Sequence, residues 1–329
     1  IARLPYGAML KQRLKAARHT LAADSPFHTQ LPNAQGTRLS LLAIDPAQST
    51  FELLTLARKT ISAQRHPVPE ILTLACFGLK AAAADRVCEA LVAAALAADF
   101  PLPDYKSKRE PATRLKTIQI FGHRANHYYA RTVAEAQGNN LARFLTALPP
   151  NELTPGNYRK RVEKLAREHG WKTEFRNIKK LKRLGAGAFL AVAQGSPEPD
   201  AGILHLRYAP KPQPRDPSRA ALASIPSAKK KSSKPALALV GKGICFDTGG
   251  TNLKNAKYMH GMHEDMQGSA VALGTLLALT ELQANFPVDC WLALAQNHIG
   301  PRSYKQNDIV TAANGKTIEV MHTDAEGRM

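Results

Sequence analysis

The sequence predicts an α/β protein built from two domains, and three observations support this. Its 329 residues are about twice the length of a typical domain. Its composition, 44% hydrophobic and 22% charged, lies in the globular range and excludes wholesale disorder. Apolar strand-like runs alternate with helical stretches along the chain. We therefore expect an N-terminal α/β domain and a second α/β domain with a mixed, largely parallel sheet.

The first of these domains is expected over residues 1–125. An apolar stretch at 81–100 contains three charged residues, so it indicates a buried helix rather than a membrane span. No targeting or membrane segment is visible elsewhere. The strand-like runs of this domain are 39–44, 70–78 and 115–122.

A connector helix is predicted at 126–147, where apolar residues recur at helical spacing. The helix must end before Pro149 and Pro150, because proline cannot continue it. The second domain then covers 148–329.

The second domain is expected to begin with a helix at 157–169, ended by Gly170 in a left-handed conformation. A strand, a helix and a strand in succession favour parallel pairing. Further elements are expected at 202–209, 236–240, 264–282, 288–295 and, before the last motif, at the strand-like TIEVM.

Positive charge is concentrated in two segments of this domain. The chain carries a formal charge of +19, and 159–184 holds eleven Lys or Arg against three Glu, while 207–234 holds eight against one Asp. A solvated helix face and a basic loop insertion at 211–235 explain this, and a surface for nucleic-acid phosphates is the alternative. The four cysteines show no metal or disulfide spacing, which favours a reducing compartment.

Two segments carry the residues with chemical potential: VGKGICFDTGGTNLKNAKYMHGMHEDMQG at 240–268 and MHTDAEGRM at 321–329. Each follows a strand-like run, and the carboxyl ends of parallel strands are where α/β proteins build sites. The charged residues are Lys242, Asp247, Lys254, Asp265, Asp324, Glu326 and Arg328.

Four carboxylates meeting at one sheet edge would repel each other unless cations lie between them. Two divalent ions sharing a bridging carboxylate would remove this repulsion and could activate a water. An amine ligand such as Lys242 favours Zn or Mn, and it must be deprotonated to bind. The segment also contains four glycines: Gly241, Gly243, Gly249 and Gly250. We expect them to permit positive φ and to let metals or substrate approach the backbone closely.

These motifs resemble the leucyl aminopeptidases, the two-metal exopeptidases of the cytosol aminopeptidase family. The resemblance rests on VGKGICFDTGG, on Lys254 seven residues after Asp247, on Asp265 in HEDM and on HTDAEGR, without gaps over 240–329. The segments 105–108 and 140–155 resemble the family more weakly.

The resemblance implies a ligand set for each metal. One ion would be held by Lys242, Asp247, Asp265 and Glu326. The other would be held by Asp247, Glu326 and Asp324, so that Asp247 and Glu326 bridge the two ions.

It also implies two catalytic residues and a general base. Lys254 would stabilise the oxyanion, and Arg328 would hold a bicarbonate that acts as general base. The family further implies peptide substrates with Leu-like N-terminal residues, a cytoplasmic homo-hexamer, and no membrane association.

Several positions depart from the family pattern and could alter specificity without touching a ligand: Thr248, His260, His263, Gln267, Ser269 and His322. The chain starts at Ile1 and stops at Met329 inside a motif, so we expect both ends to be truncated and the catalytic domain to be incomplete. Two alternatives stay open: a DNA-binding role through 159–184 and 207–234, with or without peptidase activity, and a family member that has lost activity.

Overall fold

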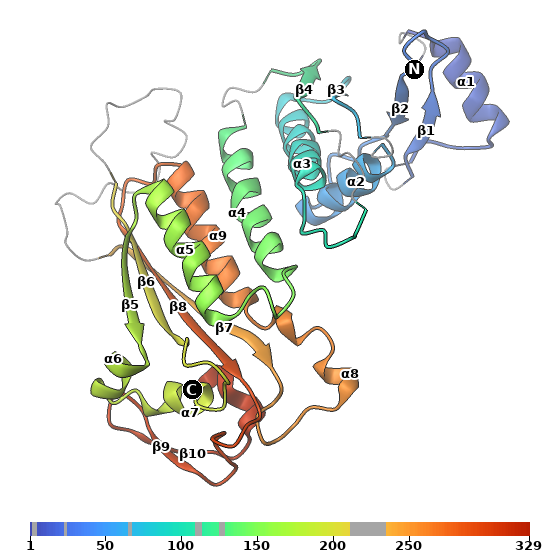
Figure 1. Ribbon diagram of the computed structural model, residues 1–329. Coiled ribbons are helices and arrows are strands. Elements are labelled where there is room, and N and C mark those ends of the chain that lie inside the picture. The colour runs from blue at the N-terminus through green and yellow to red at the C-terminus, as the bar shows by residue number, and fades with distance from the viewer. Residues whose placement is uncertain (2–4, 23–24, 65–67, 109–113, 125–128, 211–234) are drawn as a thin grey trace. The chain divides into compact units, whose positions relative to one another are not determined.

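The computed structural model divides into two compact units, which are described separately. The first comprises Ile1–Pro101 with Lys106–Val133, and the second Leu102–Tyr105 with Ala134–Met329. The structure describes all of 1–329 except residues 2–4, 23–24, 65–67, 109–113, 125–128 and 211–234 (Figure 1). The predicted basic insertion therefore lies almost wholly outside the described residues. Within the segment 126–147, predicted as a connector helix, the structure describes the helix α4 (Ala130–Thr146), and residues 126–128 lie outside the described residues.

In its described residues, the first unit contains two pairs of strands and three helices besides the start of α4. β1 and β2 form an antiparallel pair, whereas β3 and β4 pair in parallel and are connected through α3. The three strands predicted at 39–44, 70–78 and 115–122 are confirmed over shorter spans. In chain order the elements are α1 (Gly7–Ala16), β1 (Phe27–Gln30), β2 (Arg38–Leu41), α2 (Thr50–Ser62), β3 (Ile71–Ala75), α3 (Ala81–Asp99) and β4 (Thr117–Phe121).

The core of this unit lies where α2, α3 and β3 meet. α2 begins with a capping box, in which the Ser49 and Glu52 side chains each accept from the other's backbone N–H. α3 contributes most of the buried side chains, which confirms the helix predicted at 81–100. Along the described chain we find no helix with both the length and the hydropathy to span a bilayer.

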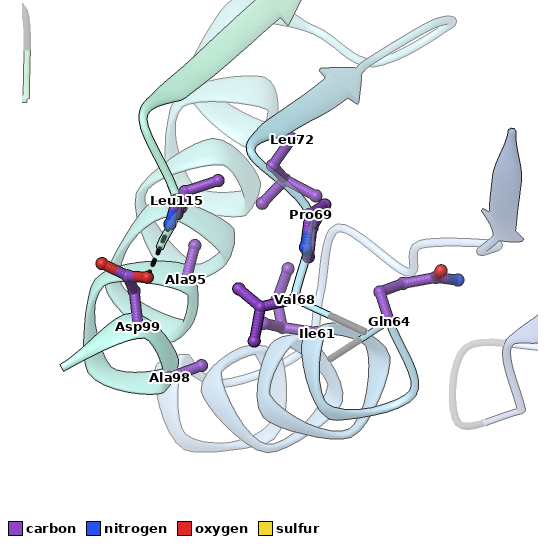
Figure 2. Close-up of a pocket in the computed structure, with 9 residues that line it drawn as sticks. All are labelled: Ile61, Gln64, Val68, Pro69, Leu72, Ala95, Ala98, Asp99 and Leu115. Carbon is purple, nitrogen blue, oxygen red and sulfur yellow. Dashed lines mark hydrogen bonds between the residues drawn. The ribbon is translucent and has the colours of Figure 1, made fainter. Parts of the chain in front are cut away.

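A small apolar cavity lies between α2, α3 and the segment that leads into β3 (Figure 2). Asp99, at the end of α3, accepts from the Leu115 backbone N–H at 2.7 Å. This bond fixes the chain as it returns toward β4. The other lining residues are Ile61, Gln64, Val68, Pro69, Leu72, Ala95 and Ala98.

In the part that the structure describes, the second unit contains a four-stranded sheet with helices on its faces and a separate two-stranded sheet. The predicted helices at 157–169 and 264–282 and the strands at 202–209, 236–240 and 288–295 are all present. The elements after α4 are α5 (Pro155–His169), β5 (Lys172–Asn177), α6 (Ile178–Arg183), α7 (Gly187–Ala193), β6 (Gly202–Tyr208), β7 (Leu237–Asp247), α8 (Ala256–Met259), η2 (Met262–Glu264), α9 (Gln267–Glu281), β8 (Val288–Asn297), β9 (Ile309–Thr311), β10 (Thr317–Glu319) and η3 (Thr323–Arg328). Gly170 ends α5 with φ +71°, as predicted.

The sheet has the order β5-β6-β8-β7 and is mixed. β7 and β8 pair in parallel, as the β7–α9–β8 succession requires, and both carry their carboxyl ends to one edge. The expectation of a largely parallel sheet holds only for this pair, because β5–β6 and β6–β8 are antiparallel. β6 is therefore antiparallel to both of its neighbours, and its pairing with β8 aligns Gly202 with Leu294.

The two faces of this sheet bury different clusters. α5 and α9 cover one face (Figure 1), where Leu204 and Leu206 of β6 meet Leu292 and Leu294 of β8. Alternate residues point the other way, so Ile244 and Ala295 pack with α7. The core therefore holds β7 and β8 rigidly between helical layers.

α4 and α9 cross at two glycines, Gly138 and Gly274. A Cβ added at Gly138 would lie 2.3 Å from the Gly274 carbonyl oxygen, and one at Gly274 would lie 2.4 Å from the Gly138 oxygen. Backbone atoms cannot move aside as a flexible side chain can. The close crossing therefore requires glycine at both positions.

We expect Gly138→Ala to lower the free energy of unfolding by about 1–3 kcal/mol, because it overpacks this crossing. In an open helix the same change would stabilise by about 1 kcal/mol. Urea unfolding followed by circular dichroism measures the difference. The exposed neighbour Asn139→Ala serves as the control and should leave stability within about 0.5 kcal/mol of wild type. A Gly138→Ala protein as stable as the control would contradict the crossing.

Candidate metal centre

A β-bulge near the end of β7 aligns two of the predicted site residues. Ile244 pairs with Ala295 and Asp247 with Asn297, so three steps along β7 match two along β8. Without the extra residue, Lys242 and Asp247 would point to opposite faces, because they are five positions apart. The bulge places both on one face.

The two glycines that flank Lys242 serve helix packing. A Cβ at Gly241 would lie 2.4 Å from the Ser269 Cα, and one at Gly243 would lie 3.1 Å from the Ser269 Oγ, so α9 begins directly on the β7 backbone. The expectation of positive φ is wrong for these two glycines, since only Gly249 and Gly250 of the four have it, at +85° and +66°.

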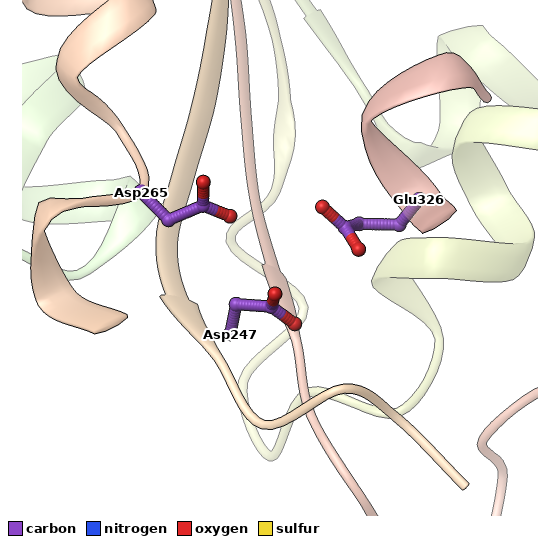
Figure 3. A group of neighbouring side chains, drawn as sticks. All are labelled: Asp247, Asp265 and Glu326. Atoms are coloured by element: carbon purple, nitrogen blue, oxygen red, sulfur yellow. The ribbon is translucent and has the colours of Figure 1, made fainter. Parts of the chain in front are cut away.

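Three carboxylates from separate segments converge at this sheet edge. Figure 3 shows Asp247 at the end of β7, Asp265 in the turn before α9, and Glu326 in η3, with their carboxylates directed toward a shared space. One oxygen from each lies within 4.8 Å of the others. Asp247 and Glu326 are buried, and Asp265 is half-buried. The predicted convergence of distant segments is thus present in the structure.

The Lys242 ammonium lies between two of these carboxylates. Its Nζ is 2.7 Å from the Glu326 Oε1 and 2.8 Å from both oxygens of Asp265. Burial acts to lower the pKa of Lys242, but the hydrogen bonds from Asp265 and Glu326 outweigh it, and the pKa lies above its usual value. Lys242 therefore neutralises the cluster as an ammonium when no metal is bound.

Lys254 neutralises the other side of the site. Its Nζ lies 3.1 Å from the Asp247 Oδ2 and donates a hydrogen bond to Asp324. The Lys254 side chain is only 14% exposed, so this cation contributes in a partly desolvated setting. Burial is the main cause that raises the pKa of both Asp247 and Asp265, and the neighbouring carboxylates raise it further.

Asn297, at the carboxyl end of β8, donates hydrogen bonds to the acidic cluster. Its Nδ2 donates to the Asp247 Oδ1 at 2.8 Å and lies 3.3 Å from the Glu326 Oε2. It also lies 3.0 Å from the Thr323 carbonyl oxygen. The residue is fully buried. Asn297 thus joins the two segments of the site through one amide.

Thr323 connects the segment 321–329 to the segment 240–268 through hydrogen bonds. Its Oγ1 donates to the Gly249 carbonyl at 2.6 Å and accepts from the Asn252 backbone N–H at 2.8 Å. The Tyr304 hydroxyl donates to the Thr323 carbonyl at 2.6 Å. Asn297, Asn252 and Tyr304 were not among the residues predicted from the sequence. Of these, only Asn297 had a signal, since it follows a predicted strand parallel to the one that ends at Asp247.

The remaining predicted residues lie close by without joining the acidic cluster. Arg328 lies in the same η3 turn as Glu326 and is exposed. The His322 Nδ1 accepts from the Asp324 backbone N–H at 3.1 Å and so caps this turn. Within the described residues the acidic cluster includes no histidine or cysteine. Cys245 is fully buried, as expected for a small apolar core residue.

The residues present fit a divalent metal. Carboxylate oxygens and an amine form the donor type that suits Zn or Mn. The Asp265 Oδ2 is buried and has no hydrogen bond besides its ion pair with Lys242 at 2.8 Å, so it can bind a metal ion once Lys242 is deprotonated. A Cβ at Gly327 would lie 3.2 Å from the Lys242 Nζ, so glycine there leaves room around the amine.

An open cavity of about 500 Å³ adjoins Lys254 and Asp324. Its walls combine apolar and polar side chains, which suits a small substrate with a polar reacting group. The other residues that line it are Asn252, Leu253, Asn255, Tyr258, Met262 and His322.

Comparison with known proteins gives the family. A model of the catalytic domain of the cytosol aminopeptidase family matches residues 140–329. The chain belongs to the cytosol aminopeptidase family. A probable cytosol aminopeptidase of Nostoc punctiforme is 37% identical over 232 residues, covering 69% of this chain and 43% of that relative. The chain thus spans less than half the length of this family member. The predicted resemblance is confirmed.

Two solved structures share the fold of this chain. A mutant of tomato leucine aminopeptidase matches with a TM-score of 0.79 and 26% identity, covering 97% of this chain and 59% of that one. The bottromycin maturation enzyme BotP, solved in complex with Mn, matches with a TM-score of 0.77 and 26% identity, covering 99% and 64%. The predicted α/β fold class is therefore confirmed.

We expect Asn297→Ala to lower the free energy of unfolding by about 2 kcal/mol, because it removes a buried amide donor shared by the Thr323 carbonyl and the Asp247 and Glu326 carboxylates. Urea unfolding measures this loss. Asn139→Ala removes an exposed asparagine from α4 and should change stability by less than about 0.5 kcal/mol. Equal stability of the two variants would show that Asn297 does not support the cluster.

Proposed function

We propose that this chain carries the active site of a metal-dependent aminopeptidase that releases Leu-like N-terminal residues from peptides. The main support is the convergence of Asp247, Asp265 and Glu326 beside Lys254 and an open cavity, in a chain of this family. If the acids and the two lysines only stabilised the fold, the structure would not require an open cavity beside them. The cavity therefore favours a binding site.

The proposed cofactors are two divalent ions, Zn or Mn. Lys242, Asp247, Asp265 and Glu326 would hold one, and Asp247, Glu326 and Asp324 the other, with Lys242 giving up its proton on binding. Bound there, the ions would polarise the scissile carbonyl and lower the pKa of a water. Asn297 already orients two of these ligands, because its amide donates to the Asp247 and Glu326 carboxylates.

Lys254 is proposed to stabilise the oxyanion that forms on the scissile carbonyl. Its ammonium is held by Asp247 and Asp324 and faces the cavity. The same carboxylates raise its pKa, although burial opposes them, so it stays charged at neutral pH. A cation positioned before the reaction stabilises the negative charge as it develops.

Arg328 is proposed to hold a bicarbonate that acts as general base. Its guanidinium can bind such an anion with two parallel hydrogen bonds, which a lysine cannot do. Its exposed position in the η3 turn, two residues from Glu326, suits an anion that enters from solvent. Free α-amines of peptides would be recognised by the neighbouring carboxylates, which restricts the reaction to N-terminal residues.

We also propose a homo-hexamer in the cytoplasm, on the family's pattern. The DNA-binding alternative gains nothing from the comparisons, and several cations of the described segment 159–184 already have partners. Arg159 lies 3.6 Å from Glu163, and Arg176 stacks 4.8 Å from the Trp291 ring. The alternative of lost activity is disfavoured by the intact donor set.

Adding Mn²⁺ or Zn²⁺ should raise the melting temperature of the wild-type protein by about 5 °C or more at saturating metal. Asp265→Asn and Glu326→Gln should each lose most of this rise, because each removes a charged donor. Differential scanning fluorimetry with and without EDTA measures it. Glu264→Gln, an exposed acid beside Asp265, should keep the full rise. A full rise in both donor variants would refute the ligand set.

Hydrolysis of leucine p-nitroanilide should fall by a factor of about 10²–10³ in kcat for Lys254→Met, because the oxyanion loses its cation. The metal-dependent rise in melting temperature should remain, since Lys254 is not a proposed ligand. Lys257→Met removes an exposed lysine from the adjacent helix and should leave kcat unchanged. Wild-type kcat in Lys254→Met would exclude its proposed role.

A further inference from the structure

The first unit contains two thiols in direct contact. The Sγ atoms of Cys76 and Cys88 lie 3.2 Å apart, and both residues are buried. We propose that Cys76 and Cys88 are a reversible oxidation site, where a hydroperoxide converts the two thiols into a disulfide. This site is separate from the proposed metal centre and does not depend on it.

The backbone holds the two sulfurs in place from different elements. Cys76 follows β3 directly, and its N–H donates to the Phe121 carbonyl at 2.9 Å. A Cβ at Gly122 would lie 2.0 Å from the Cys76 carbonyl oxygen, so β4 presses closely on this residue. Cys88 lies in the middle of α3 and is fully buried. A disulfide requires the sulfurs to approach by only about 1 Å.

The contact also prepares one sulfur to react. A hydrogen bond joins the two thiols and lowers the pKa of Cys76 to about 7. Cys76 is also the more accessible of the two, since it is 7% exposed and Cys88 is 0% exposed. The same hydrogen bond, together with burial, raises the pKa of Cys88. Cys76 is therefore the attacking thiolate and Cys88 the thiol that resolves the product.

Polar groups lie near the two thiols in this part of the core. The His123 Nε2 lies 2.6 Å from the Asp85 Oδ1, one turn before Cys88 on α3. The Tyr129 hydroxyl contacts the Cys88 thiol. Two thiols that only packed in the core would stay neutral and would not require polar neighbours. Burial admits only a small oxidant, which favours a hydroperoxide over a large disulfide.

The chemistry balances with hydrogen peroxide as the oxidant. The Cys76 thiolate attacks one oxygen, the O–O bond breaks, and hydroxide leaves and takes up a proton to give water. The Cys88 sulfur then attacks the Cys76 sulfenic acid, the S–S bond forms and the S–O bond breaks. The hydroxide leaves with the Cys88 proton as a second water. Two thiols are oxidised and one peroxide is reduced.

The product would join β3 to α3 and close a short loop. Because such a crosslink limits the unfolded chain, oxidation should raise the melting temperature of the unit by about 5 °C. Cytosolic disulfides are usually transient and sense redox state, so a thiol reductant should reverse the change.

Two other buried cysteines provide an internal control. Cys245 and Cys290 lie in the second unit and are fully buried, and burial raises the pKa of each. Neither has a hydrogen-bonded thiol partner among the contacts of the described residues. They should resist an oxidant that converts Cys76 and Cys88.

The test treats the native wild-type protein with hydrogen peroxide, alkylates free thiols, and maps peptides by mass spectrometry without reduction. We expect one crosslinked pair, Cys76 with Cys88, reversal by dithiothreitol, and intact thiols at Cys245 and Cys290. Cys88→Ser should instead leave Cys76 as a sulfenic acid that dimedone labels. Free thiols at Cys76 and Cys88 under peroxide that oxidises a thioredoxin standard would overturn the proposal, as would further oxidation of either to a sulfinic acid or equal oxidation of all four cysteines.

Discussion

Buried negative charge is the constraint on which the second unit depends. Asp247, Asp265 and Glu326 lie too close together to stay charged without cations between them. Without a metal, the ammonium groups of Lys242 and Lys254 supply that charge, and each contacts two carboxylates. The proposed metals would replace the role of Lys242 and turn it from a counter-ion into a ligand. The same arrangement therefore explains both the stability of the folded state and the proposed binding of metal ions.

The rest of the fold serves to hold these charges at one sheet edge. The parallel β7–β8 pair brings Asp247 and Asn297 side by side, and one buried amide connects both segments of the site. Helix α9 rests on the β7 backbone because residues 241 and 243 have no side chain, which sets the position of the turn that carries Asp265. Precision at the site thus comes from backbone packing as much as from the acidic residues.

Much of this could be predicted from sequence, for identifiable reasons. The strand–helix–strand succession predicted the parallel pair, and the spacing of Lys242, Asp247, Asp265 and Glu326 matched a known family. The bulge before Asp247 could not be predicted, because it depends on register with β8 rather than on local residues. The antiparallel pairing of β6 and the role of Asn297 were missed for the same reason. The β6 pairing and the contacts of Asn297 depend on the order of the strands in the sheet, which the local sequence does not show.

The central claim is that these carboxylates and Lys242 surround divalent cations. A crystal structure of the protein with Zn²⁺, with anomalous data collected at the zinc edge, tests it most directly. The account predicts two peaks about 3.5–4 Å apart, one of them bonded to Lys242 and Asp265 and both to Asp247 and Glu326. Absence of zinc from this edge of the sheet at saturating metal, with Lys242 still paired to Asp265 and Glu326, would contradict it.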